Sequence, residues 1–195
     1  MVNIETDSHG RTYQLWRQQQ ANSCGVAATW MARGIVRRMS INEDEWALAQ
    51  RVYRNAVENA LAPLGAAADG GMSLNPEAHA NDRSTMASAL ANAGFFARQL
   101  ALALRGEGIR VHHAGLTGHR RIVVHSRISI TQPAIALIYW DNGGGHFVVV
   151  GRCTPRVITY LDPWDGHINE QSNNGVYNAR YNRRGQIGEI LYLTA

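Results

Sequence analysis

Short apolar runs rich in β-branched residues, separated by turn residues, fill the second half of the chain. The two clearest are residues 134–140 (AIALIYW) and 146–150 (HFVVV), and Asp-Asn-Gly-Gly-Gly at 141–145 joins them. A short connection that contains glycine and asparagine is typical of a β-hairpin. The same pattern predicts further strands at 122–124, 157–161, 176–181 and 187–193. This part of the chain, about 109–195, therefore predicts an antiparallel sheet.

The first half of the sequence has the periodicity of helices. Residues 25–32 form an apolar, alanine-rich run that follows Asn22 and Ser23, both good residues for a helix N-cap. A capping box of Ser40 and Glu43 then precedes a second, amphipathic stretch.

A loop at 64–83 and two short helices within 84–104 complete the first half. Helices followed by an antiparallel sheet predict an α+β fold. We expect one domain over residues 1–195, with a helical part at about 14–105 and a sheet part at about 109–195.

The composition is that of a folded globular protein. Of the 195 residues, 45% are hydrophobic and 17% are charged, which is enough for one buried core. No apolar run approaches the roughly 18 residues that a membrane span needs. The first residues lack a basic region followed by an apolar stretch, so no cleavable signal peptide is expected. We expect the protein in the cytoplasm of its producer, or in a target cell that it reaches by a specialised secretion system.

The charge pattern gives no indication of a nucleic-acid partner. The net charge is +4, and all 19 lysine-plus-arginine positions are arginine. These arginines are scattered in singles and pairs, without a basic helix or an aromatic-basic repeat. The absence of lysine has two explanations, codon usage or the avoidance of ubiquitin attachment inside a eukaryotic cell, and both stay open.

Cys24 stands where the first helix is expected to begin. The free N–H groups and the positive end of the helix dipole favour the thiolate there, which is the nucleophilic form of cysteine. A free cysteine is also common as a small apolar core residue. This segment alone leaves both interpretations open. With only Cys24 and Cys153, the chain has too few cysteines for a disulfide scaffold or a cysteine-based zinc site.

A nucleophilic thiol needs a base and a third group that orients the base. Among eight histidines, His146 is distinctive because it follows three glycines and opens a wholly apolar strand. A buried histidine there needs a polar partner, and Asp162 ends the next strand, where antiparallel pairing brings the two positions together. Taken singly, these residues are better explained as a core histidine and a turn aspartate. Together with Cys24 they favour a catalytic role.

No metal site is expected from the other histidines. His112 and His113 are neighbours, so on a strand they point to opposite faces. His119 and His125 lie among arginines, which disfavour a bound cation. No organic cofactor is expected either.

The order glutamine, cysteine, histidine, aspartate resembles that of the papain-like cysteine peptidases. Gln18 and Cys24 match the Gln-x5-Cys spacing of that superfamily. The segment 133–163 looks most like the bacterial branch that includes the bacteriocin-leader peptidases of ABC exporters, with Gly-His after an apolar strand and Asp-Pro sixteen residues after the histidine. The resemblance covers about residues 14–32 and 133–166. The cysteine context, Asn-Ser-Cys-Gly-Val-Ala, differs from the Cys-Gly-Ser-Cys-Trp of papain and the cathepsins.

The resemblance implies a papain-like fold, in which a helical lobe carrying Cys24 packs against an antiparallel sheet carrying His146 and Asp162. It implies that the Cys24 thiolate attacks a peptide carbonyl, that His146 delivers the proton and that Asp162 orients His146. The Gln18 amide and the Cys24 N–H would bind the oxyanion. Trp164 is placed like the tryptophan that shields the histidine in plant papains.

The implied function is that of a cysteine protease, a hydrolase that acts on a protein or peptide substrate through a Cys-His-Asp triad. The expected setting is that of a bacterial effector or toxin acting on proteins of another cell, with a cognate immunity or inhibitor protein as a possible partner. The same triad would serve a deamidase, a transglutaminase-like enzyme or an acyltransferase. A non-catalytic peptide-binding module is a third alternative.

Overall fold

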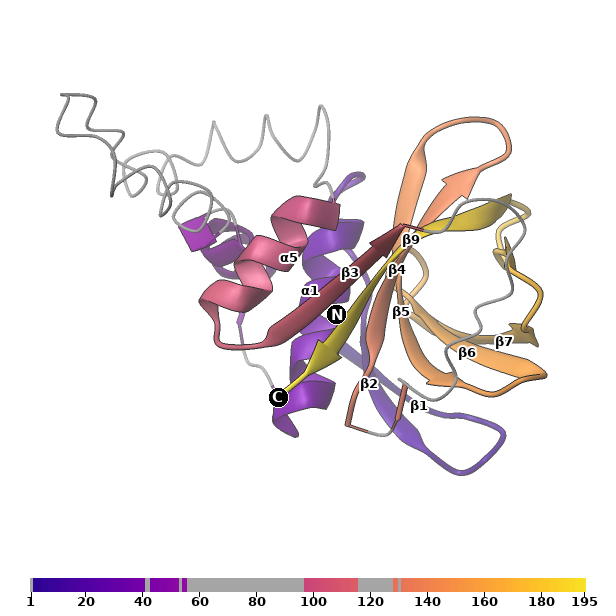
Figure 1. Ribbon diagram of the computed structural model, residues 1–195, viewed down its shortest axis with the longest axis horizontal. Coiled ribbons are helices and arrows are strands. Elements are labelled where there is room, and N and C mark those ends of the chain that lie inside the picture. The colour runs from indigo at the N-terminus through magenta and orange to yellow at the C-terminus, as the bar shows by residue number, and fades with distance from the viewer. Residues whose placement is uncertain (1, 41–42, 53, 56–96, 116–127, 130) are drawn as a thin grey trace, which may run out of the picture.

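The protein is built of two layers, helices on one side and a curved antiparallel sheet on the other (Figure 1). The computed structural model describes residues 2–40, 43–52, 54–55, 97–115, 128–129 and 131–195. The described helices are α1 (Cys24–Arg37), residues 45–52 with 54–55, and α5 (Ala97–Gly106). The strands are β1 (Val2–Thr6), β2 (Thr12–Trp16), β3 (Arg110–Gly115), β4 (Ala134–Trp140), β5 (Gly145–Cys153), β6 (Val157–Asp162), β7 (His167–Ser172), β8 (Val176–Asn178) and β9 (Arg184–Thr194).

The large sheet has the strand order β3-β9-β4-β5-β6-β7, and β8 pairs with β9. Each of these pairings is antiparallel. Helix α1 packs against β5 and α5 packs against β3, so both helices cover the same side of the sheet. The predicted α+β class, with an antiparallel sheet in the second half of the chain, is confirmed.

Two apolar cores lie on the two faces of the central strands. On β4, Ile135 and Leu137 face the helices, while Ala136 and Ile138 face the other side, as the alternation of a strand requires. Because β4 and β5 are buried on both faces, they are apolar almost throughout.

The expected hairpin joins β4 to β5. The Trp140 N–H donates to the Gly144 carbonyl at 3.1 Å, and the Gly143 N–H donates to the Trp140 carbonyl at 3.0 Å. Gly143 and Gly144 have φ angles of 89° and 83°, a conformation that favours glycine. The glycine run is therefore what allows the turn that leads into His146.

The start of α1 lies close to β5 because residue 25 is glycine. A Cβ at this position would stand 3.3 Å from a Phe147 ring atom and 3.3 Å from a Leu100 methyl group. Ser23 occupies the N-cap position, but its hydroxyl bonds to Gln20 and makes no capping bond. Cys24 is thus the first residue of α1 and faces the sheet.

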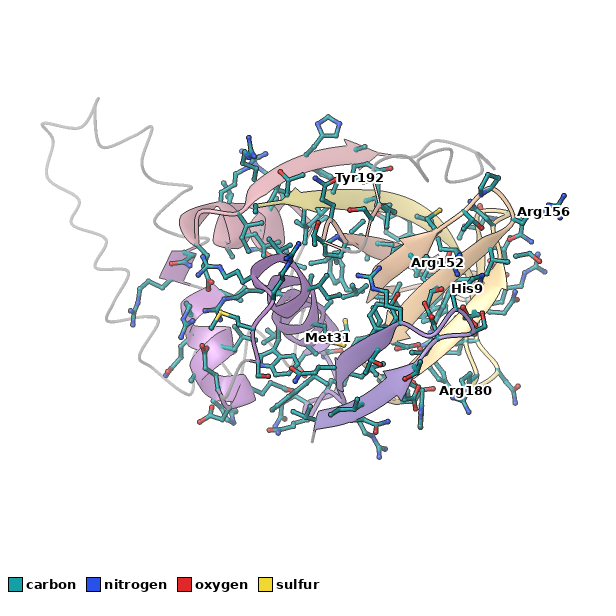
Figure 2. The ribbon with its side chains drawn as sticks, turned by 90° about the horizontal axis from the view of Figure 1, so that it is seen from below. His9, Met31, Arg152, Arg156, Arg180 and Tyr192 are labelled. Atoms are coloured by element: carbon teal, nitrogen blue, oxygen red, sulfur yellow. The ribbon has the colours of Figure 1, made fainter. Side chains whose placement is uncertain are left out.

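The prediction that the helical part begins at about residue 14 is wrong. Residues 2–16 form a hairpin of β1 and β2, and the helical part begins at Cys24. The hairpin packs on β7, where Glu5 accepts the Ile168 N–H at 2.8 Å. Figure 2 shows the hairpin beside the sheet, with Arg156 and Arg180 on the side of the sheet away from the helices.

The predicted capping box is wrong. The second helix begins at residue 45, and Asp44 caps it by accepting the Ala47 N–H at 2.7 Å. Glu43 pairs instead with Arg33 and Arg51. Glu43 therefore forms ion pairs in place of the capping hydrogen bond that the local motif predicts.

The late strands are found as β8 and β9, and the polar strand β7 was not predicted. The predicted helix at 95–104 corresponds to α5. The predicted loop at 64–83, the helix from Ser84 and the strand at 122–124 lie outside the described residues. No helix in the described part of the chain is long and apolar enough to cross a membrane.

Candidate active site

The Cys24 thiol lies at the junction of α1 and β5. Burial alone would raise the pKa of this thiol, but four interactions lower it below its ordinary value: a hydrogen bond from His146, the charge of His146, and the backbone N–H groups of Phe147 and Gly25. Two of the donors thus come from β5 and one from the first turn of α1. These surroundings favour the nucleophilic thiolate.

His146 connects the thiol to a buried carboxylate. Its Nε2 lies 2.7 Å from Asp162 Oδ1, which leaves Nδ1 as the nitrogen that faces Cys24. The side chain is only 4% exposed, and burial alone would lower its pKa. The hydrogen bonds to Asp162 and Cys24 outweigh burial and raise the pKa of His146 to about 9. The imidazole is therefore held as a cation at neutral pH.

Asp162, at the end of β6, accepts four hydrogen bonds. Its Oδ1 accepts from His146 and from the Trp164 N–H at 2.8 Å, and its Oδ2 accepts from the hydroxyls of Tyr177 at 2.5 Å and Tyr181 at 3.1 Å. Burial would raise the pKa of Asp162, but the donors and the charge of His146 lower it. A fully bonded carboxylate of this kind stays ionised and fixed in orientation.

The aromatic residue that covers His146 is not the expected one. The ring stacked on His146 is that of Trp140, with 5.5 Å between centroids and 17° between planes. Trp164, expected to shield the histidine, is 44% exposed and contacts Tyr181. Trp140 precedes the hairpin to β5, so the turn itself folds this ring over the imidazole.

Gln18 lies in the loop before α1, but its amide is turned toward its own loop. Its Nε2 donates to the carbonyls of Gln20 at 2.8 Å and Ala21 at 3.0 Å. Its Oε1 is buried without a hydrogen-bond partner within the described residues. The Gln18 N–H also donates to the Pro163 carbonyl at 2.7 Å, which ties the loop to the residue after Asp162.

Glu45, which sequence reasoning missed, holds the same loop from the second helix. Its Oε2 accepts from the Trp16 indole at 2.8 Å and from the Gln19 N–H at 2.8 Å, and its Oε1 accepts from the Gln20 N–H at 3.3 Å. The side chain is buried. No pattern in the sequence indicates this role, because the bonds are made to backbone groups 25 and 26 residues away.

A cleft of about 420 Å³ opens beside the thiol. It is lined by Ala21, Asn22, Cys24, Leu137, Tyr139, Trp140, Gly145, His146, Phe147, Trp164, Tyr181, Arg183 and Glu189. The cleft is thus bounded by the loop before α1, by β4 and β5 with their hairpin, and by segments around β9. Three of the four predicted site residues lie together, and two of these three line the cleft.

The other cysteine and the remaining described histidines are not among the residues that line the cleft. Cys153 is buried, and burial raises its pKa to about 11, so it is a poor nucleophile at neutral pH. Both cysteines are free. His112 stacks on Tyr192 and His167 bonds to Glu5. No group of three histidine, cysteine, aspartate or glutamate side chains suited to a metal ion occurs among the residues that the structure describes.

Comparison with known proteins finds similarity among solved structures only. No protein-family model matches the chain, and no curated protein matches it. Among solved structures, the chain is similar to the Pseudomonas avirulence protein AvrPphB, with a TM-score of 0.39 and 11% sequence identity. The alignment covers 90% of this chain and 92% of that chain. At this TM-score the likeness carries no functional conclusion, so the function has to come from the residues around Cys24.

Proposed function

We propose that the protein is a papain-like cysteine peptidase whose catalytic residues are Cys24, His146 and Asp162. The observation that supports this most directly is the hydrogen-bonded series from the thiol through the imidazole to a buried carboxylate. A thiol with a lowered pKa beside an imidazole with a raised pKa forms a thiolate–imidazolium pair at neutral pH. The pair opens onto a cleft that has room for a peptide.

In this mechanism the Cys24 sulfur attacks the carbonyl carbon of the scissile peptide bond. The proton on Nδ1 of His146 passes to the leaving amine, and an acyl-enzyme remains on the sulfur. A water molecule then gives a proton to His146, attacks the acyl carbon and releases the acid. Asp162 holds Nε2 throughout, so Nδ1 keeps facing the sulfur.

The oxyanion in this mechanism is stabilised by the Cys24 N–H and the Gln18 amide. For Gln18 to donate, its amide has to turn away from the carbonyls of Gln20 and Ala21. The rotation breaks those two bonds only, because Oε1 has no hydrogen-bond partner among the described residues. Each such donor contributes about 10²–10³ in rate in well-studied acyl-transfer enzymes.

The proposed setting is that of a bacterial effector or toxin that acts on proteins of another cell. The composition supports it, since a chain without lysine offers ubiquitin no side-chain amine inside a eukaryotic target cell. Its partners would be protein substrates and a cognate immunity or inhibitor protein in the producer.

The test is incubation of the protein with a mixture of glutamine-containing proteins, followed by mass spectrometry. New fragments that disappear with Cys24→Ala support the peptidase. An intact substrate that gains a single mass unit identifies a deamidase with the same residues, and an intact cross-linked or acylated substrate identifies a transferase. Cys153→Ala is the matched control, because it removes the other thiol and should leave the reaction intact. No reaction with any substrate, although iodoacetamide labels Cys24, would favour a peptide-binding module.

A further inference from the structure

The cleft continues from the thiol along one face of the sheet and ends at a carboxylate. Phe147 pairs with Leu137 across β5 and β4, and Leu137 pairs with Glu189 across β4 and β9. Directly paired residues point to the same face, so these three side chains form a row. Neighbouring strands lie about 4.8 Å apart, which places the Glu189 backbone roughly 10 Å from that of Phe147. The Cys24 sulfur accepts the Phe147 N–H at the other end of this row, so the Glu189 backbone stands roughly 10 to 14 Å from the thiol.

The Glu189 carboxylate is held in place by two neighbours. Its Oε1 accepts the Tyr139 hydroxyl at 2.6 Å, and its Oε2 lies 2.6 Å from His113 Nε2. The Tyr139 ring lies directly over Gly188, where a Cβ would stand 2.1 Å from a ring atom. Each carboxylate oxygen can accept more than one hydrogen bond, so both retain capacity for a further donor. The Glu189 side chain is 27% exposed, so a ligand in the cleft can reach it.

The floor between the thiol and this carboxylate is apolar. Phe147 and Leu137 are 3% and 9% exposed, and both line the cleft. Arg183 also lines the cleft and carries a positive charge. Its guanidinium lies over the Trp140 ring at 4.7 Å and bonds to Asn142. Its charge is thus on the side of the hairpin, while the row from Phe147 to Glu189 ends in a negative charge.

We propose that Glu189 forms a subsite for an arginine or lysine side chain of the substrate, near the scissile bond. A long basic side chain lies with its methylene stem on Leu137 and Phe147 and its cationic head at the carboxylate. An arginine guanidinium matches a carboxylate in geometry and in charge. The inference rests on the proposed peptidase function for the bond that is cleaved, but the subsite itself depends only on the row of side chains.

Arginine and citrulline peptides test the subsite, because the two side chains have the same length and differ in charge. Fluorogenic peptides carry one or the other at each of the two positions on either side of the scissile bond. Wild-type protein should favour arginine over citrulline at one position by about 10- to 100-fold in kcat/KM, the range expected for a charged hydrogen bond. In Glu189→Gln this ratio should fall to within about threefold of unity. Asp141→Asn is the matched control, because it removes a carboxylate outside the cleft and should keep the wild-type ratio.

Alkylation of Cys24 separates failure of the subsite from failure of the peptidase proposal. Dipeptidyl chloromethyl ketones with arginine or citrulline react with the thiol without any hydrolysis, and intact mass reports the rate. Faster labelling by the arginyl ketone, lost in Glu189→Gln, supports the subsite even if no peptide is cleaved. Equal rates for the two ketones in the wild-type protein, together with no arginine preference in peptides after the scissile bond, overturn the subsite even if peptides are cleaved. Labelling by iodoacetamide but by neither ketone overturns it as well.

Discussion

The substitution Asp162→Asn isolates the charge of the buried carboxylate from its hydrogen bonds. An asparagine oxygen can still accept from His146 Nε2 and from the Trp164 N–H, which are the two bonds on Oδ1. The new amide group would face the hydroxyls of Tyr177 and Tyr181, which can act as acceptors. We therefore expect the fold and the position of His146 to survive, while the negative charge beside the imidazole is lost.

The size of the effect follows from the pKa of His146. This pKa stands at about 9 against an ordinary value of 6.5, and Asp162 accounts for the largest favourable contribution. A return of the pKa to its ordinary value lowers it by about 2.5, which is on the order of 3 kcal/mol. The ratio of ion pair to neutral pair depends on the difference between the pKa values of His146 and Cys24. With that return, the ratio falls by about 300-fold.

The assay is the pH dependence of two rates, iodoacetamide alkylation of Cys24 and peptide hydrolysis. Because the pKa of His146 is raised, the imidazolium persists in the wild-type protein until the pH rises through about 9, and hydrolysis should fall above that pH. In Asp162→Asn the alkaline fall should move toward neutral pH, and alkylation at pH 7 should drop by 10- to 300-fold. Asp162→Ala should lose more, because the imidazole then has no acceptor.

Asp165→Asn is the control for loss of a nearby charge. Asp165 accepts the His167 N–H, whereas the groups that raise the pKa of His146 are Asp162 and Cys24, so removal of Asp165 should leave the alkaline fall at about pH 9. If the profiles of Asp162→Asn and Asp165→Asn coincide, Asp162 does not stabilise the imidazolium, and the reasoning about the ion pair is wrong.

Three further experiments test the thiol and the loop before α1. Iodoacetamide at neutral pH should label Cys24 and spare Cys153, whose pKa burial raises to about 11, and peptide mapping that finds Cys153 labelled first would reverse the assignment. Gln18→Ala should cut kcat by about 10²-fold with little change in KM, whereas the kcat of Gln19→Ala should stay within a few-fold of the wild-type value. The opposite order in steady-state kinetics would show that the Gln-x5-Cys register is wrong. Glu45→Gln should lower kcat for hydrolysis at least tenfold. It should leave alkylation of Cys24 by iodoacetamide unchanged, because alkylation forms no oxyanion. A parallel fall in both rates would mean that Glu45 supports only the fold.

The sequence predicted those parts of the fold that local patterns determine. The β4–β5 hairpin follows from two apolar runs and a glycine-rich joint, and α1 follows from the apolar run after Ser23. The hairpin of residues 2–16 was missed because its strands are short and β1 is largely exposed. The capping box failed for a different reason, since Glu43 forms ion pairs with Arg33 of α1 and with Arg51 of the second helix.

The candidate site shows the same division between local and tertiary information. Cys24, His146 and Asp162 were found because each stands at the end of a helix or strand, where a polar side chain in an apolar run needs an explanation. Tyr177 and Tyr181 were missed because their bonds to Asp162 depend on how β8 and the segment after it fold back over β6. Glu45 and Glu189 were missed similarly, because each acts on backbone or side-chain groups from other elements.

The three consecutive glutamines have a common role that a motif alone does not reveal. The Gln18 side chain holds the loop by donating to the carbonyls of Gln20 and Ala21, whereas Gln19 and Gln20 hold it through their backbone N–H groups, which donate to Glu45. Only at position 18 does the side chain make these contacts. In the proposed mechanism the Gln18 amide turns from these carbonyls to the oxyanion, which would couple the shape of the loop to the chemistry at Cys24. The buried carboxylate of Glu45 fixes the rest of the loop, so that the Gln18 amide is the part left to move.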